Sequence, residues 1–149
     1  MNIEFRVEGK PPKKDGSQSL WSERSNQALL VFNLREKAFE AKQTAKIEGS
    51  FSGLVKIKIS IFAPFITIND QHQHVGDLDN LVAGIFESIQ PASNNETLTP
   101  NKIFDQNPDV APHIALLIDD DSQVVSLSAE KIKSNLNYYV VEIESIEGL

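Results

Sequence analysis

The chain has 149 residues, of which 40% are hydrophobic, and a formal net charge of -7. A chain of this length usually folds around a single core, so we expect one domain over residues 1–149. It contains no cysteine, which excludes disulfides and thiolate metal sites. Nothing in it resembles a signal peptide or the roughly 18 apolar residues of a membrane helix, so we expect a soluble, cytoplasmic protein with no membrane partner.

The charge is unevenly distributed along the chain. Residues 1–60 carry 11 Lys or Arg and 7 Asp or Glu, a balance of +4, whereas residues 61–149 carry 3 and 14, a balance of -11. The acidic total argues against nucleic-acid binding by the surface as a whole, because like charges repel phosphate. The basic part can still meet phosphates, and a bound cation would offset part of the acidic charge.

The first segment predicts a strand followed by a basic loop. Residues 2–8 alternate polar and apolar side chains, which is typical of a half-buried strand. Residues 9–16 contain two prolines and two glycines, which predicts a loop that carries Lys10, Lys13 and Lys14. Two roles remain open for these lysines: contact with nucleic-acid phosphates, or a plain solvated loop.

The next two elements are predicted from their periodicity. Residues 22–43 have apolar side chains at three- and four-residue steps, which predicts a helix with Ser22 as its N-cap. We expect its basic residues, including Arg35 and Lys42, on the solvent side. Residues 54–62 alternate strictly and predict the clearest strand of the chain.

A second helix is predicted from Asp77 to Pro91. It opens with Asp-Leu-Asp-Asn-Leu at 77–81, and an apolar stripe follows. The structural alternative for this acidic pair is that either Asp77 or Asp79 caps the helix and the other aspartate adds a favourable charge at its positive end. Gly84 destabilises such a helix unless its missing side chain permits the close approach of the sheet or of a second subunit.

The last third contains a long loop and a second acidic run. Residues 91–112 have no clear pattern and are expected to form a long loop or insertion. Residues 123–131 and 137–145 predict two strands that form a hairpin. Three aspartates at 119–121 enter the first of these strands; they are either a plain polar turn or, together with the earlier pair, oxygen ligands for a hard divalent cation.

These elements predict an α/β (α+β) fold: a small mixed sheet of about four strands with two helices, in the order β-α-β-α-β-β. The element order, with Asp-Leu-Asp-Asn-Leu at 77–81 and Asp-Asp-Ser-Gln-Val at 120–124, resembles the RusA family of Holliday junction resolvases. Members of that family are small, dimeric, Mg²⁺-dependent endonucleases. The resemblance covers nearly the whole chain.

The resemblance implies a site and a function. By position, the catalytic and metal-binding carboxylates fall on Asp77, Asp79 and Asp121, with Asp120 as an acidic neighbour. The implied cofactor is Mg²⁺, with Mn²⁺ as a substitute. The implied function is hydrolysis of phosphodiesters in branched DNA, such as a four-way junction, by a homodimer during recombination and repair. The stretch Gly9-Lys10-Pro11 resembles the loop that follows the first strand of the family.

One position departs from the family pattern. The catalytic lysine of the family lies one helical turn after the second aspartate, and that position is Ala83 here. Lys102 in the 91–112 loop is a possible replacement cation. Two alternatives therefore stay open beside the nuclease: a RusA-like domain that binds nucleic acid or a protein without cutting, and an acidic domain unrelated to nucleic acid whose aspartates are caps.

Overall fold

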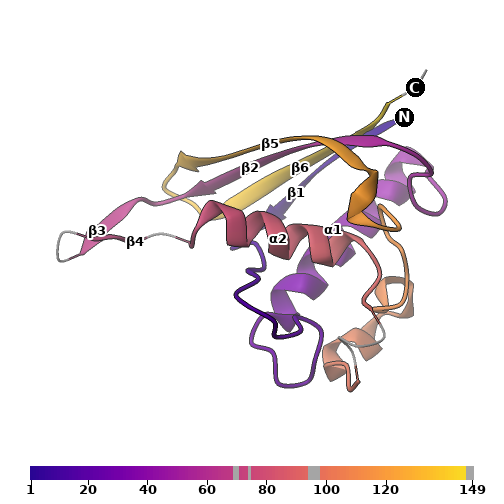
Figure 1. Cartoon of the computed structure of the whole chain (residues 1–149), viewed down its shortest axis with the longest axis horizontal. Helices are drawn as coiled ribbons and strands as arrows, with labels where there is room; N and C mark the ends of the chain where they lie inside the picture. Colours follow the sequence, from indigo (N-terminus) through magenta and orange to yellow (C-terminus); the bar gives the residue numbers. More distant parts are fainter. Residues whose placement is uncertain (69–70, 74, 94–97, 147–149) are drawn as a thin grey trace.

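The computed structural model describes residues 1–68, 71–73, 75–93 and 98–146, with the backbone alone for 66–68 and 71–73. The strands are β1 (Asn2–Glu8), β2 (Val55–Ala63), β3 (Ile66–Ile68), β4 (Gln71–Gln73), β5 (Val124–Lys133) and β6 (Tyr138–Ser145). The helices are α1 (Ala28–Ala45) and α2 (Leu78–Ile89), with short 3-10 helices η1 (Lys102–Gln106), η2 (Pro108–Val110) and η3 (Asp121–Gln123). The predicted order β-α-β-α-β-β is confirmed, and the β3–β4 hairpin is an addition to it (Figure 1).

Four strands form one mixed sheet in the order β1-β6-β2-β5. β6 is antiparallel to both of its neighbours, whereas β5 runs parallel to β2. β2 therefore separates β5 from β6, and the predicted hairpin between these two strands is wrong. The physical reason lies in their side chains: β6 buries alternate residues and suits a central position, whereas most β5 side chains are exposed, as at an edge.

One face of the sheet forms the core. The alternation predicted for β1 and β2 is confirmed, since Phe5 is 7% exposed and Ile57, Ile59 and Ile61 are at most 1% exposed. Both helices lie on this face: α1 contacts β1 and α2 contacts β5, and the two helices contact each other (Figure 1). The helix pair thus places the start of α2 near the edge strand β5.

The first helix begins at Ala28 rather than near Ser22. Trp21 is completely buried and its ring lies 5.4 Å from that of Phe104. Ser22 forms an isolated bridge with Pro100. These contacts hold the residues before α1 in a non-helical conformation, so Ser22 is not the N-cap that the pattern predicted.

Two basic residues of α1 are buried, contrary to the prediction that they face solvent. Arg35 has no exposed surface and donates hydrogen bonds of 2.7 to 3.4 Å to the carbonyls of Ser88, Gln90, Val110, Ala111 and Ile114. Lys42 donates to the carbonyl of Leu116 at 2.7 Å. Burial lowers the pKa of Arg35 to about 9, so its guanidinium keeps its charge at neutral pH.

The 91–112 segment, expected as a long loop or insertion, packs against α1. Its described part contains η1 and η2, and its side chains Phe104 and Val110 are buried in the core. Carbonyls that pair with no strand or helix need donors, and Arg35 supplies them for residues 110, 111 and 114. The segment is therefore part of the single core.

Candidate active site

The aspartate pair lies at the start of α2. Asp77 is the N-cap residue with an extended backbone, and Asp79 lies in the first turn. Both side chains are exposed, and the side chain of Asp77 forms no capping hydrogen bond. The positions predicted by the structural alternative are therefore confirmed, with Asp77 as the N-cap residue and Asp79 in the first turn, but the Asp77 carboxylate makes no capping hydrogen bond. Both carboxylates lie at the positive end of the helix dipole.

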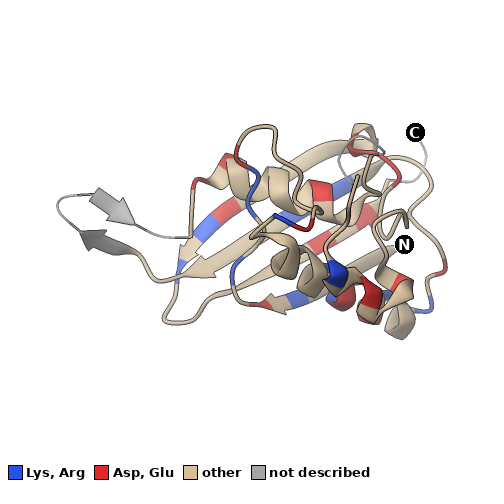
Figure 2. Ribbon diagram, turned by 90° about the horizontal axis from the view of Figure 1, so that it is seen from below, with Lys and Arg blue, Asp and Glu red and all other residues tan. Residues whose placement is uncertain are grey.

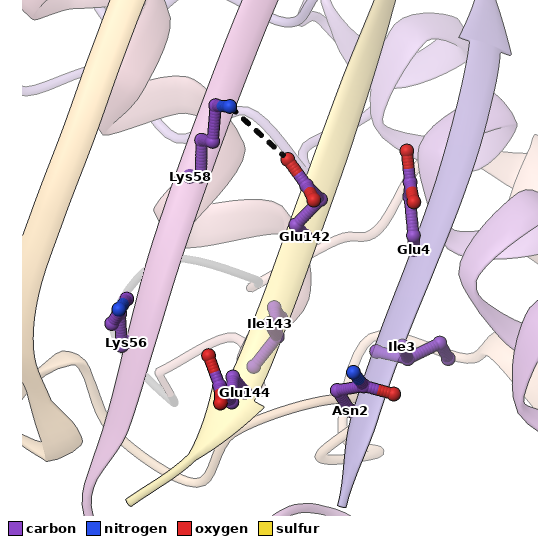
Figure 3. A pocket seen from close by; sticks show the side chains of 8 residues that line it. All are labelled: Asn2, Ile3, Glu4, Lys56, Lys58, Glu142, Ile143 and Glu144. Carbon is purple, nitrogen blue, oxygen red and sulfur yellow. Dashed lines mark ion pairs between the residues drawn. The ribbon is translucent and has the colours of Figure 1, made fainter.

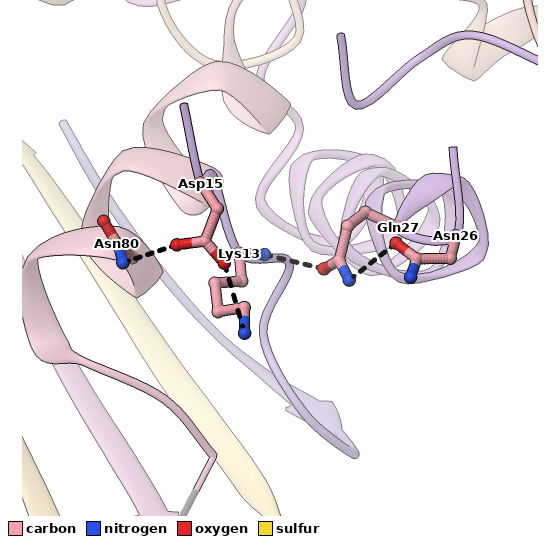
Figure 4. Close-up of polar contacts among 5 residues, drawn as sticks. All are labelled: Lys13, Asp15, Asn26, Gln27 and Asn80. Carbon is pink, nitrogen blue, oxygen red and sulfur yellow. Dashed lines mark hydrogen bonds and ion pairs between the residues drawn. The ribbon is translucent and has the colours of Figure 1, made fainter. Parts of the chain in front are cut away.

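The loop of residues 9–20 crosses the first turns of this helix. The backbone N–H of Lys14 donates to the carbonyl of Asn80 at 3.0 Å, and the Asn80 side chain donates to Asp15 at 2.6 Å (Figure 4). A Cβ on Gly84 would overlap the carbonyl oxygen of Pro12. The close approach expected at Gly84 therefore exists, but the neighbour is this loop rather than the sheet or a second subunit.

The three lysines of this loop differ in their surroundings. Lys10 is exposed. The ammonium of Lys13 lies 3.3 Å from Asp15 (Figure 4), with the side chain 38% exposed. Lys14 is only 12% exposed in its side chain; its ammonium lies 3.4 Å from Glu87 and donates to a backbone carbonyl at 2.6 Å. Lys14 therefore stabilises the fold, while Lys10 and Lys13 remain accessible to a phosphate.

Another lysine at the start of α2 was missed by the sequence analysis. Lys131 of β5 donates from its ammonium to the carbonyl of Gly76 at 3.0 Å, directly before Asp77. Lys131 pairs with the buried Ile61 across the sheet, so its side chain points to the helix-covered face. The alternation of β5 could have predicted this position, because residues two apart on a strand share a face and Lys131 therefore points inward with Ala129.

The second acidic run forms a capped turn. Asp120 is the N-cap of η3 and accepts a hydrogen bond from the N–H of Ser122 at 3.1 Å. Two hydrogen bonds from Ser122 lower the pKa of the Asp120 carboxyl: the larger effect comes from the Ser122 side chain and the smaller from its backbone N–H. Gln123 completes the capping box and also donates to the carbonyls of Phe51 and Gly53 at 2.7 and 2.8 Å. Asp120 therefore has a structural role in this turn.

Asp121 lies at the opposite end of α2 from the aspartate pair. Its backbone N–H donates to the side-chain oxygen of Gln90, the C-cap residue of α2, at 3.1 Å. A surface hollow at this end is lined by Glu87, Gln90, Pro91, Ser93, Asp119, Asp120 and Asp121. With a rise of 1.5 Å per residue, the helix separates Asp79 from Gln90 by roughly 16 Å.

One chain therefore does not bring the three expected carboxylates together. Within the residues that the structure describes, no group of three or more His, Asp or Glu side chains could hold a metal ion. The reason is the direction of β5: it starts beside the end of α2 and returns antiparallel to the helix, so that Lys131, not Asp121, reaches Gly76. The described side chains of a single copy therefore do not gather the three carboxylates expected to hold Mg²⁺.

The possible replacement cation Lys102 lies on a different part of the fold. It is exposed on η1, which packs on α1 through Phe104. Ala83, the position of the family's lysine, lies on α2 one helical turn after Asp79 and is half-buried. Lys131 and Lys13 are the lysines that lie against Gly76, at the entrance to α2.

A further hollow lies on the open face of the sheet. Its polar lining combines Lys56 and Lys58 with Glu4, Glu142 and Glu144 (Figure 3). Lys58 and Glu142 approach to 3.9 Å, and both side chains are about half exposed. Figure 2 shows the same interleaving of basic and acidic residues along the strands. Charges of both signs alternate here without converging on a common point, so we assign no catalytic role to this face.

The fold and the site together define a small α+β protein with two exposed carboxylates and a lysine at the start of its second helix. No protein-family model matches the chain, and no curated protein is significantly similar to it. In the part of the chain that is described, no helix combines the length and the apolar character needed to cross a membrane.

Proposed function

We propose that this protein is a Mg²⁺-dependent endonuclease that hydrolyses phosphodiesters in branched DNA, such as a four-way junction. As the resemblance to RusA resolvases implies, it would act as a cytoplasmic homodimer in recombination and repair. The two acidic motifs enter α2 and β5 in the order that this resemblance requires. The observation that carries the proposal is the pair Asp77 and Asp79: two exposed carboxylates, neither consumed by capping, beside a lysine.

The proposed metal site requires three aspartate side chains. Aspartate oxygens are the ligands that Mg²⁺ and Mn²⁺ prefer. Asp77 and Asp79 supply two of the three side chains that the resemblance assigns, whereas Asp121 of the same copy lies at the other end of α2. A complete set on this proposal needs Asp121 from a second copy, in keeping with the proposed homodimer.

The start of α2 also has features that suit a phosphate. Backbone N–H groups at a helix N-terminus attract phosphate oxygens, and the positive end of the dipole adds to the attraction. Lys131 brings its ammonium group to the same end of the helix, where the aliphatic part of Lys13 also lies against Gly76. On this proposal Lys131 supplies, from the sheet, the positive charge that the family places at the position of Ala83.

The test is nicking of a synthetic four-way junction with Mg²⁺ or Mn²⁺. The wild-type protein is expected to cut, and Asp79→Asn to lose at least about 100-fold in rate, because a neutral amide oxygen binds a divalent cation less tightly than a charged carboxylate. Asp109→Asn, at an exposed aspartate of η2, is the matched control and keeps the wild-type rate. Equal rates for the wild type and Asp79→Asn contradict the assigned chemistry.

A second candidate function is binding of branched DNA without cleavage. The alanine at position 83 and the separation of Asp121 from Asp79 favour it. Junction binding that persists in EDTA, with no product at any metal concentration, supports this alternative against the nuclease. Binding that does not weaken as salt rises argues against both, because phosphate contacts are strongly salt-dependent, and favours an acidic domain unrelated to nucleic acid.

A further inference from the structure

The edge strand β1 has an open side. It spans 7 residues and, among the described strands, pairs with β6 alone (Figure 3). At its two ends, the N–H of Gly9 donates to the carbonyl of Asn137 at 2.9 Å, and the N–H of Ser145 donates to the carbonyl of Met1 at 2.8 Å. Because alternate residues of an antiparallel pair bond to the neighbouring strand, the odd-numbered residues of β1 bond to β6. The N–H and C=O groups of residues 2, 4, 6 and 8 therefore point outward.

A groove of about 450 Å³ runs along this edge, between β1 and α1. Ile3 and Phe5 line it from the strand and are 5% and 7% exposed. Ala41, Thr44 and Ala45 line it from α1, where their three- and four-residue steps place them on one face of the helix. Their small side chains leave room beside the strand. The edge thus offers backbone partners to an extended peptide and space for its side chains, the arrangement by which sheets bind peptides as an added strand.

The charges of β1 indicate which partner fits. Glu4, Arg6 and Glu8 alternate along the open face and are all exposed. Arg6 is held in place, because its Nε donates to Glu8 at 2.6 Å and its guanidinium lies 3.7 Å from the centroid of the Tyr138 ring. Directly opposite residues of neighbouring strands share a face and interact. The complementary strand therefore carries a basic, an acidic and a basic residue at alternate positions.

A second copy of β1 is a poorer complement than such a strand. Antiparallel self-pairing over residues 4–8 would place Glu4 opposite Glu8 and Arg6 opposite Arg6, so that every pair has like charges. The basic-acidic-basic pattern is symmetric and fits β1 in either direction. The residues between these charges point to the α1 side, where Phe5 and Ala41 line the groove, and apolar side chains such as valine suit that position.

We propose that the groove between β1 and α1 binds an extended segment of a partner protein with the pattern basic-apolar-acidic-apolar-basic. The segment adds to the sheet as a strand, with its acidic residue opposite Arg6 and its basic residues opposite Glu4 and Glu8. β1 and β5 are the two opposite edges of the sheet. A partner at β1 therefore leaves the start of α2 beside β5 accessible, and the proposal does not depend on the nuclease activity.

The first test uses a synthetic peptide, Ac-Thr-Lys-Val-Glu-Val-Lys-Thr-amide, with a fluorescent label and without DNA or metal. The control, Ac-Thr-Lys-Val-Lys-Val-Glu-Thr-amide, has the same composition and net charge but the wrong order. In fluorescence anisotropy the first peptide is expected to bind at least about 10-fold tighter than the control. Equal affinities overturn the proposal, and so does the absence of binding by the first peptide up to about 1 mM.

The second test fills the groove. Thr44→Trp places a large side chain in it and is expected to weaken peptide binding at least about 10-fold. Gln43→Trp, at an exposed residue of α1 that does not line the groove, is the matched control and keeps the wild-type affinity. Equal effects of the two substitutions overturn the groove as the binding site. If the peptide does not bind and Thr44→Trp instead dissociates a wild-type dimer, a second copy occupies the groove and the proposed partner is wrong.

Hydrogen exchange distinguishes strand addition from binding by side chains alone. The amides of Glu4 and Arg6 point outward and gain a hydrogen bond from an added strand, so they are expected to exchange at least about 10-fold more slowly with the peptide bound. The amide of Phe5 already bonds to β6 and should change less. Peptide binding without slower exchange at Glu4 and Arg6 overturns the added strand.

Discussion

Gly84 of α2 lies so close to Pro12 that a Cβ on residue 84 would overlap the Pro12 carbonyl oxygen. The loop cannot easily retreat, because the N–H of Lys14 is bound to the carbonyl of Asn80 at 3.0 Å. This relationship fixes the loop of residues 9–20 over the helix that carries the candidate site.

Gly84→Ala is expected to destabilise the protein. Alanine improves helix propensity by about 1 kcal/mol, but the overlap forces backbone shifts that cost about 1–3 kcal/mol. The clash outweighs the propensity because the neighbour is backbone. We expect a net loss of up to about 2 kcal/mol in the free energy of unfolding in urea. Ala83→Ser adds one heavy atom at the next position and serves as the control. A Gly84→Ala variant as stable as the wild type contradicts the close approach.

Arg35→Met is expected to be among the most destabilising substitutions in the chain. It removes the Arg35 donor from five backbone carbonyls, of which that of Ala111 keeps a hydrogen bond from the N–H of Ile114 at 3.0 Å. Each unsatisfied buried group costs about 1–3 kcal/mol, and partial relaxation brings the expected total to at least about 3 kcal/mol.

Arg35→Met should lower the stability of the segment around residues 107–118 as well as that of the whole protein. Hydrogen exchange of the amides between residues 107 and 118 is expected to accelerate most, because Arg35 binds the carbonyls of this segment. Arg24→Met, at an exposed arginine, should change stability by less than about 0.5 kcal/mol. Equal effects of the two substitutions would show that Arg35 does not organise this segment.

The burial of Arg35 marks the limit of what periodicity can predict. Alternation identified β1 and β2 with their inward faces, and the apolar stripe identified α2, because local patterns determine which side of an element is buried. Periodicity treats each charged residue as solvent-facing. It cannot reveal that a distant segment, here residues 110–114, brings carbonyls to Arg35.

The candidate site likewise has a part that the local sequence predicts and a part that it does not. The position of Asp77 and Asp79 at a helix start follows from local sequence, and it is confirmed. The proximity of Lys131 to Gly76 and the distance of Asp121 from Asp79 depend on the direction in which β5 returns along α2. Strand order and direction arise from long-range pairing, which the spacing of motifs along a chain does not encode.

The two lysines Lys10 and Lys14 should differ in DNA binding. Lys10 is exposed, whereas the ammonium of Lys14 is held by Glu87 and by the carbonyl of Gln18. In junction binding measured across salt in EDTA, Lys10→Ala is expected to reduce the slope of log K against log salt by about 0.9, as one lost phosphate contact does. Lys14→Ala should leave the slope unchanged and lower the unfolding midpoint instead. Equal slope changes would mean that Lys14 leaves Glu87 to bind DNA.

Lys131→Gln tests which lysine compensates for Ala83. Glutamine keeps a polar donor group on β5, but the positive charge at the start of α2 is lost. We expect the single-turnover cleavage rate to fall about 100-fold, in the range observed when a charge-stabilising donor is removed, while junction affinity changes less. Lys131→Arg should recover part of the rate, because it restores the charge.

Lys102→Gln is the matched control for this substitution. Lys102 is exposed on η1 and was the replacement cation suggested by sequence alone. Because η1 packs on α1 and Lys131 contacts the entrance to α2, the control should cut at the wild-type rate. The opposite ranking, with Lys102→Gln slow and Lys131→Gln unaffected, would assign the cation to the 91–112 segment. It would also require that segment to approach Asp77 and Asp79 when DNA binds.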